Sequence, residues 1–316
     1  MASYIVRRVL QMVPVVVLVS AVAFSLLFVL PGDPALAILG EEQAKNQQLY
    51  QQLRTQLGLD RPLPVQYVDW ASKVIRGDLG TSTRTQLPVS QLLVQRIGPT
   101  AQLSVMAMVL GVLVAIPVGV LSAVKPNSRS DVVGTVLAMV GASIPPFWLG
   151  LLLILAFALW LRWLPPSGYV SPTKDLGANL ALMVMPTVTL AGGIAAIVMR
   201  QTRSALLEVL RQDYVTTARA KGLMERVVLT KHALRNALIP IVTVIGLEFG
   251  HLMGGAVITE TIFSVPGVGR LAADSIFQRD FPVLQAVVLL LAFAVLLANL
   301  VTDIAYAWLD PRIRYR

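Results

Sequence analysis

Glu248 and His251 are the residues of this sequence best suited to proton chemistry, and they lie three positions apart in an apolar stretch. On a helix this spacing makes two side chains neighbours. If the stretch crosses a membrane, the carboxylate costs on the order of 3 kcal/mol and should face other helices or water. The pair could join two helices by a hydrogen bond, line a polar pathway or relay protons, and the residues leave these three interpretations open.

Other catalytic and metal-binding signatures are missing from the sequence. The chain has no cysteine and only two histidines, His232 and His251, which excludes thiolate sites and a histidine-rich metal cluster. It has no G-x-x-x-x-G-K-[ST] segment, so it lacks a P-loop for ATP. It also lacks the H-E-x-x-H motif, Ser–His–Asp order or carboxylate cluster that an intramembrane enzyme would need. We therefore expect a non-catalytic chain without a cofactor or metal of its own.

The composition is typical of a membrane protein. Hydrophobic residues make up 56% of the 316 positions, charged residues only 14%, and the mean hydropathy is +0.72. Soluble domains contain about 25% charged residues. Six apolar runs reach the roughly 20 residues that a transmembrane helix needs, so we predict an all-α polytopic fold with six spans. The runs cover residues 9–33, 97–124, 132–161, 176–199, 236–259 and 281–302.

The distribution of charge predicts the orientation of these spans. Six crossings place both termini on one side of the membrane, together with residues 125–131 and 200–235. That side holds 15 Lys and Arg against six acidic residues, whereas the other side holds 11 against 10. Because positive charge collects on the cytoplasmic side, both termini are predicted to be cytoplasmic. The net charge of +9 then reflects topology, and no basic patch interleaved with aromatic residues suggests nucleic-acid binding.

Three segments divide the chain. Residues 1–95 contain the first span and a long external part, with a polar helix that ends near Gly58 and an interfacial helix that stops near Gly77. Residues 96–308 form a five-helix module, and residues 309–316 form a cytoplasmic tail. The external part is either a cap without chemistry or a contact for an external protein.

Two prolines interrupt the third span. Pro145 and Pro146 each remove a backbone donor and should break the helix near the middle of the membrane. Such breaks are tolerated only where protein or a water-filled cavity covers the freed backbone groups. The break is either a harmless kink or a bend that shapes a pathway. In the second case, the two prolines would form a gate together with Glu248 and His251.

The fifth span carries a glycine repeat. Gly246, Gly250 and Gly254 recur every four residues and therefore lie on one face of a helix. Small residues on one face let a second membrane helix approach closely. We therefore predict that this face packs against another span.

A polar loop, residues 213–240, separates the fourth and fifth spans. Asp213 is suited to cap a helix and Gly222 to end it, which predicts about two helical turns. Tyr214, Ala218 and Lys221 would then share one face, and a second helix would continue into the fifth span. A short helix joined rigidly to a span can transmit a push from another protein. Alternatively, the loop is basic only because positive charge collects on the cytoplasmic side of a membrane.

The loop sequence "DYVTTARAKG…HALRNALIP" resembles the cytoplasmic coupling loop of ABC-importer permeases of the dipeptide, oligopeptide and nickel family. The stretches "RRVLQMVPVVVLVSAVAFSLLFVLPGDPA", "LGLDRPLPVQY", "RGDLGTS", "PTAQLSV", "SIPPFWLG", "GGAVITETIFSVPGVGRL" and "DPRIRY" extend the resemblance over nearly the whole chain, and they are most similar to the first of two permease subunits. Thr216 and Thr217 replace the Glu-Ala of the broad importer signature. The resemblance implies an ATPase-coupling helix made by Asp213, Tyr214, Thr217, Ala218, Lys221 and Gly222.

The resemblance also implies a type I importer in the cell membrane of a prokaryote. Its partners would be a second, similar permease, two ATPase subunits that bind ATP and Mg²⁺, and an extracytoplasmic substrate-binding protein. The external loop, residues 260–281, would face the binding protein through Pro266, Gly267, Gly269 and Arg270. Permeases that look like this one carry dipeptides, longer peptides, glutathione or nickel chelates.

An ion-coupled secondary transporter that works alone is the alternative from another class. Glu248 and His251 would be its proton sites. The sequence shows no inverted repeat of the kind that many such transporters contain.

Overall fold

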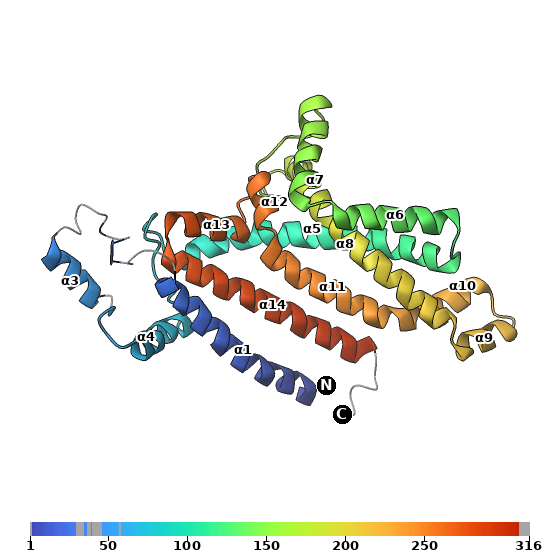
Figure 1. Cartoon of the computed structure of the whole chain (residues 1–316), viewed down its shortest axis with the longest axis horizontal. Helices are drawn as coiled ribbons and strands as arrows, with labels where there is room; N and C mark the ends of the chain where they lie inside the picture. Colours follow the sequence, from blue (N-terminus) through green and yellow to red (C-terminus); the bar gives the residue numbers. More distant parts are fainter. Residues whose placement is uncertain (1, 30–34, 37–38, 40–45, 57, 310–316) are drawn as a thin grey trace.

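Helices account for every named element of the computed structural model, which describes residues 2–29, 35–36, 39, 46–56 and 58–309. Five of them have the length and hydropathy of membrane spans. These are α1 (Ala2–Val29), α5 (Val89–Val124), α8 (Leu176–Leu210), α11 (Arg235–Gly255) and α14 (Phe281–Leu309). The predicted tail lies outside the described residues, apart from its first position. Figure 1 shows α3 and α4 at one end of the bundle and α9 and α10 at the other.

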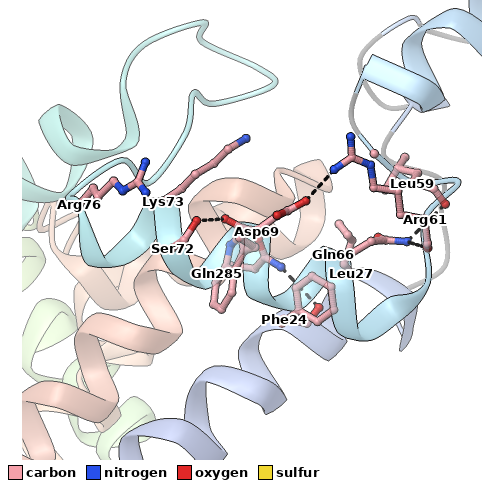
Figure 2. Close-up of a pocket in the computed structure, with 12 residues that line it drawn as sticks. Phe24, Leu27, Leu59, Arg61, Gln66, Asp69, Ser72, Lys73, Arg76 and Gln285 are labelled. Carbon is pink, nitrogen blue, oxygen red and sulfur yellow. Dashed lines mark hydrogen bonds and ion pairs between the residues drawn. The ribbon is translucent and has the colours of Figure 1, made fainter.

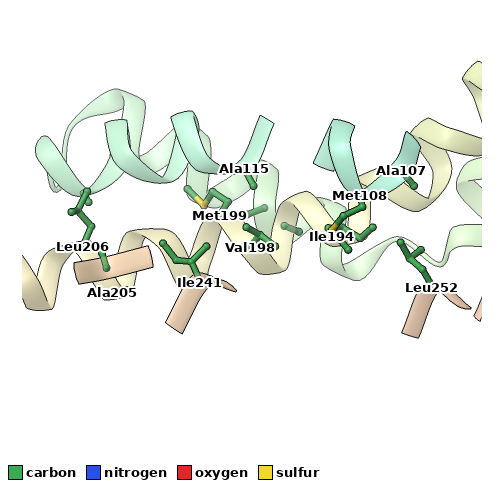
Figure 3. Packing of buried hydrophobic residues seen from close by; sticks show 14 of the residues in the cluster. Ala107, Met108, Ala115, Ile194, Val198, Met199, Ala205, Leu206, Ile241 and Leu252 are labelled. Carbon is green, nitrogen blue, oxygen red and sulfur yellow. The ribbon is translucent and has the colours of Figure 1, made fainter. Parts of the chain in front are cut away.

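The centre of the bundle is the contact between α5 and α8, which α11 covers (Figure 3). Small residues let the two long helices come close: a methyl group added at Gly119 would lie 2.7 Å from Thr202, and one added at Gly111 would lie 2.9 Å from Ile194. Close backbone approach replaces the hydrophobic effect as the main source of helix association in lipid. Ile241 and Leu252 bring α11 into the same buried cluster.

The predicted third span does not cross the bundle as one rod. It consists of α6 (Arg129–Ser143) and, after a bend of 100°, α7 (Pro146–Leu153) and the π-helix η1 (Ile154–Trp160). Ile144 and Pro145 are extended, with ψ of 120° and 134°. The residue before a proline avoids the helical region, so two consecutive prolines turn the chain sharply. Figure 1 shows α7 projecting away from the helices that run along the bundle.

The external segment contains two further helices, α3 (Gln47–Gln56) and α4 (Leu63–Ile75). Gly58 and Gly77 follow them with positive φ of 68° and 83°, which is the left-handed geometry that glycine adopts at helix ends. Asp280, at the start of α14, accepts hydrogen bonds from the Ser82 hydroxyl and the Thr83 amide. This contact fixes the external segment to the bundle. The predicted division at residues 95 and 96 falls inside α5.

Candidate coupling loop and gate

The loop after α8 folds into α9 (Asp213–Ala220) and α10 (Glu225–Val227), and α10 continues through the π-helix η2 (Val228–Leu234) into α11. Asp213 is not the cap that the sequence predicted. Gln212 takes the cap position with extended backbone and no side-chain cap bond, and Asp213 is the first helical residue. An acidic residue there still complements the positive end of the helix.

Three contacts hold the two helices of this loop together. The Arg219 guanidinium donates to both Glu225 oxygens, at 3.1 and 2.7 Å, and so joins α9 to α10. The Asn236 amide donates to the Tyr214 hydroxyl at 2.9 Å, which ties α9 to the start of α11. Between these bonds Val215 packs with other apolar side chains of the loop in a small core. The loop is therefore attached to α11 as one body.

Ala218 is buried, although the helical spacing placed it on one face with Tyr214 and Lys221, which are both exposed. It is 6% exposed and packs in the small core with Val215 and Val228. The segment is helical as predicted, but α9 packs against the rest of the loop with Ala218 on the inner side. Ala218 therefore contributes to the loop's stiffness, and its surface is not open to another protein.

Most residues of the loop are exposed, Tyr214 and Thr217 of α9 among them. At the tip, Lys221 and Gly222 are exposed, and Gly222 has a φ of 77° that turns the chain out of α9. The apolar residues Leu223 and Met224 follow, at 40% and 74% exposure. The sequence pattern alone predicted no role for Leu223 or Met224. One feature of the sequence could have indicated this surface: two apolar residues directly follow a glycine that ends a helix in an otherwise polar loop.

The candidate gate residues are not joined in this structure. Glu248 is half-buried and His251 is exposed on α11, and among the described residues no hydrogen bond or ion pair links them. Pro145 and Pro146 lie at the bend before α7, which packs mainly on α8 and α12. The geometry gives no specific support to a proton relay.

The glycine repeat of α11 lies beside α14. A methyl group added at Gly246 would overlap the Thr302 side chain of α14, while one at Gly250 would meet Val295 at an ordinary 3.7 Å. Close approach thus depends on Gly246. Gly254 belongs to the same helix, and its surroundings lie outside the described residues.

The external loop places its glycines inside the protein. It consists of α12 (Val257–Ile262), a turn and α13 (Val268–Gln278), and both Gly267 and Gly269 are buried. A methyl group at Gly267 would overlap the Glu260 carboxyl group, and one at Gly269 would lie 2.9 Å from the Val257 backbone. These two positions therefore cannot meet a binding protein directly, contrary to the prediction. Pro266 and Arg270 are partly exposed.

Glu260 is the centre of this external turn and has no exposed surface. Its carboxylate accepts hydrogen bonds from the Thr100 hydroxyl of α5, at 2.6 Å, and from the Arg270 amide, at 2.8 Å. The same hydroxyl accepts from the Val268 amide at 2.8 Å. Burial raises the pKa of the Glu260 carboxyl, and the bonds from Thr100 and the α13 amides oppose that rise. The carboxylate joins α5, α12 and the first turn of α13.

Comparison with sequence families matches almost all of the chain. Residues 115–315 match the family described as "Binding-protein-dependent transport system inner membrane component". Residues 1–104 match the corresponding N-terminal membrane component family.

Similar curated proteins cover the full length of the chain. A probable peptide ABC transporter permease protein, y4tP, of Sinorhizobium fredii is 44% identical over 315 residues. The glutathione transport system permease protein GsiC of Salmonella typhimurium is 42% identical over 316 residues. The dipeptide transport system permease protein DppB of Alkalihalophilus pseudofirmus is 40% identical over 335 residues. In all three, 100% of both chains is covered.

Among solved structures, inward-facing forms of the MetNI methionine ABC transporter share the fold. One such chain has a TM-score of 0.58 at 21% identity and covers 70% of this chain and 97% of its own length. A second crystal form gives a TM-score of 0.56 at 20% identity, with the same coverage. At this identity the likeness concerns the fold, which is that of a type I importer membrane domain.

Proposed function

Because this chain belongs to the family of binding-protein-dependent transport system inner membrane components and is a permease subunit of an ABC importer, we propose that its cargo is a di- or oligopeptide. The cargo is drawn from the names of the relatives, two of which are peptide permeases and one a glutathione permease. Glutathione is itself a small peptide, so one chemical class covers all three names.

The coupling loop is the observation that carries the mechanism. We infer that the tip of this loop, residues 221–224, docks on an ATPase subunit, which would bind the ATP and Mg²⁺. The Arg219–Glu225 bonds and the buried Ala218 make the tip rigid with respect to α11. A displacement of the tip would therefore move α11 with it, which is how a packed element passes on a rigid-body motion.

Two more partners complete the proposed importer. A second, similar permease would form the other half of the pathway. A binding protein would deliver the peptide on the external side, where Pro266 and Arg270 are partly exposed.

Exchange of one apolar residue at the tip tests the docking. Leu223→Glu should weaken ATPase binding by about 10- to 100-fold, because a leucine buried in an interface contributes about 1.5–3 kcal/mol. Leu87→Glu is the matched control, since Leu87 has the same 40% exposure and lies in the external segment, away from the loop. Co-purification of the ATPases and peptide-stimulated ATP hydrolysis are the readouts. Unchanged assembly and hydrolysis in Leu223→Glu would exclude the docking role.

Uptake by the assembled transporter tests the cargo. Labelled dipeptide uptake should be inhibited by unlabelled peptides, and ATPase inactivation should abolish it. Inhibition by nickel chelates alone would assign a different cargo to the same permease. Uptake that persists without the ATPases and stops when the proton gradient is removed would refute ATP coupling itself.

A further inference from the structure

A cavity of about 430 Å³ lies where α4 crosses α1 and meets α14 (Figure 2). Its apolar side is formed by Phe24 and Leu27 of α1 and by Trp70 of α4. The Gln285 amide of α14 donates to the Phe24 carbonyl beside it, at 3.4 Å. The cavity belongs to the external segment and shares no residue with the coupling loop or the gate.

Three cations surround this cavity. Figure 2 shows Arg61 on one side and Lys73 and Arg76 on the other. Among the described residues of the lining, Asp69 is the one with an acidic side chain, and Arg61 binds it at 2.9 Å. In the part of the chain that the structure describes, Lys73 and Arg76 have no acidic partner. The described lining therefore carries a net positive charge, and Lys73 and Arg76 are its two cations without an acidic partner among the described residues.

The cavity lies at the depth of the lipid headgroups. The first span ends at Phe28, so Phe24 and Leu27 occupy its last two turns. The neighbouring α4 is held to α1 by the Ser20–Tyr67 hydrogen bond of 2.7 Å and by the tilted contact between the rings of Phe24 and Trp70. Ile75 on α4 is 85% exposed, as expected of a helix that lies on the membrane surface with its apolar side in the lipid.

We infer that the cavity between α1, α4 and α14 binds the phosphate headgroup of an anionic phospholipid in the external leaflet. Lys73 and Arg76 bind the phosphate oxygens, and Phe24, Leu27 and Trp70 contact the glycerol and the upper acyl chain. A basic pocket between membrane helices at the interface suits an anionic headgroup. The α1 surface below the cavity continues this site, since the span is only 11% buried. The inference rests on the membrane location and is independent of the cargo.

Quenching by brominated lipids tests the site directly. The full-length permease is reconstituted in phosphatidylcholine nanodiscs that contain brominated phosphatidylglycerol, or brominated phosphatidylcholine in a parallel sample. The difference between wild type and Trp70→Phe isolates the quenching of Trp70, which lines the cavity. Wild type should prefer phosphatidylglycerol over phosphatidylcholine. The double variant Lys73→Gln/Arg76→Gln should lower that preference about 25-fold, because each of the two cations near a membrane surface contributes about a fivefold factor in binding.

Arg84→Gln is the matched control, because Arg84 is an exposed cation of the same external segment outside the cavity. It should keep the preference for phosphatidylglycerol. A preference that survives in the double variant, or that falls equally in the control, overturns the assignment. Loss of the preference with millimolar inorganic phosphate would assign the cavity to free phosphate and likewise overturn the lipid. Size-exclusion profiles of the nanodiscs, and peptide-stimulated ATP hydrolysis after assembly with the partner subunits, check that each variant is folded.

Discussion

Replacing Gly267 by alanine should break the external turn around Glu260. The added methyl group would overlap the carboxyl group of Glu260, which is fully buried and held by hydrogen bonds. The carboxylate must leave its position between α5 and α13. Its bonds from the Thr100 hydroxyl and the Arg270 amide would then be lost or stretched.

The expected cost follows from those two bonds. A hydrogen bond to a charged group contributes about 1.5–3 kcal/mol, so complete loss of both would cost about 3–6 kcal/mol. Partial relaxation of α12 and α13 lowers this to about 3 kcal/mol, the upper end of the cost of overpacking. For a chain of this size, 1 kcal/mol shifts Tm by about 2 °C, so Tm should fall by about 6 °C.

Thermal unfolding in nanodiscs measures this loss of stability, and two further variants serve as a control and as a partial mimic. Gly193→Ala is the matched control, because a methyl group at Gly193 of α8 would meet nothing within 4 Å. It should leave stability unchanged or raise it by up to about 1 kcal/mol through helix propensity. Thr100→Val should mimic part of the Gly267→Ala effect, because it removes a donor to Glu260 and an acceptor for the Val268 amide.

Equal Tm values for Gly267→Ala and Gly193→Ala would refute this reasoning. The reasoning would also be refuted if Gly267→Ala lost stability and Thr100→Val lost none. Either result would show that the Glu260 carboxylate does not hold the turn.

Two further predictions concern the cytoplasmic end. Gly222→Val should lower peptide-stimulated ATP hydrolysis more than Gly222→Asn. The φ of 77° at this position costs a β-branched residue more than the roughly 1–2 kcal/mol typical of left-handed geometry. Equal activities of the two variants would contradict this prediction. Arg203→Met should cost about 3 kcal/mol in thermal unfolding because it leaves the buried Asp131 carboxylate unpaired. Arg203→Met/Asp131→Asn should recover part of that loss, and a double variant as unstable as the single one would contradict the pairing.

Local signals in the sequence located the elements correctly. Five of the six apolar runs correspond to helices long enough to cross a membrane, because only a helix can satisfy its own backbone in lipid, and the third run corresponds to the bent pair of α6 and α7. Gly58, Gly77 and Gly222 marked helix ends, because each has the positive φ that glycine accepts at no steric cost. The prolines at positions 145 and 146 marked a break. The sequence could not supply the 100° angle, because that angle depends on what α7 packs against.

The sequence by itself therefore determined the class of protein, the positions of its apolar runs and the place of the polar loop between α8 and α11. Only the tertiary structure decided which side of each element is covered. Ala218 turned inward because Val228 of the returning helix packs on it, and Gly267 is buried because Glu260 needs its space. The Thr100–Glu260 bond joins positions 160 residues apart. Helical periodicity relates only neighbours along the chain, so contacts between distant segments are set by the packing of the whole bundle.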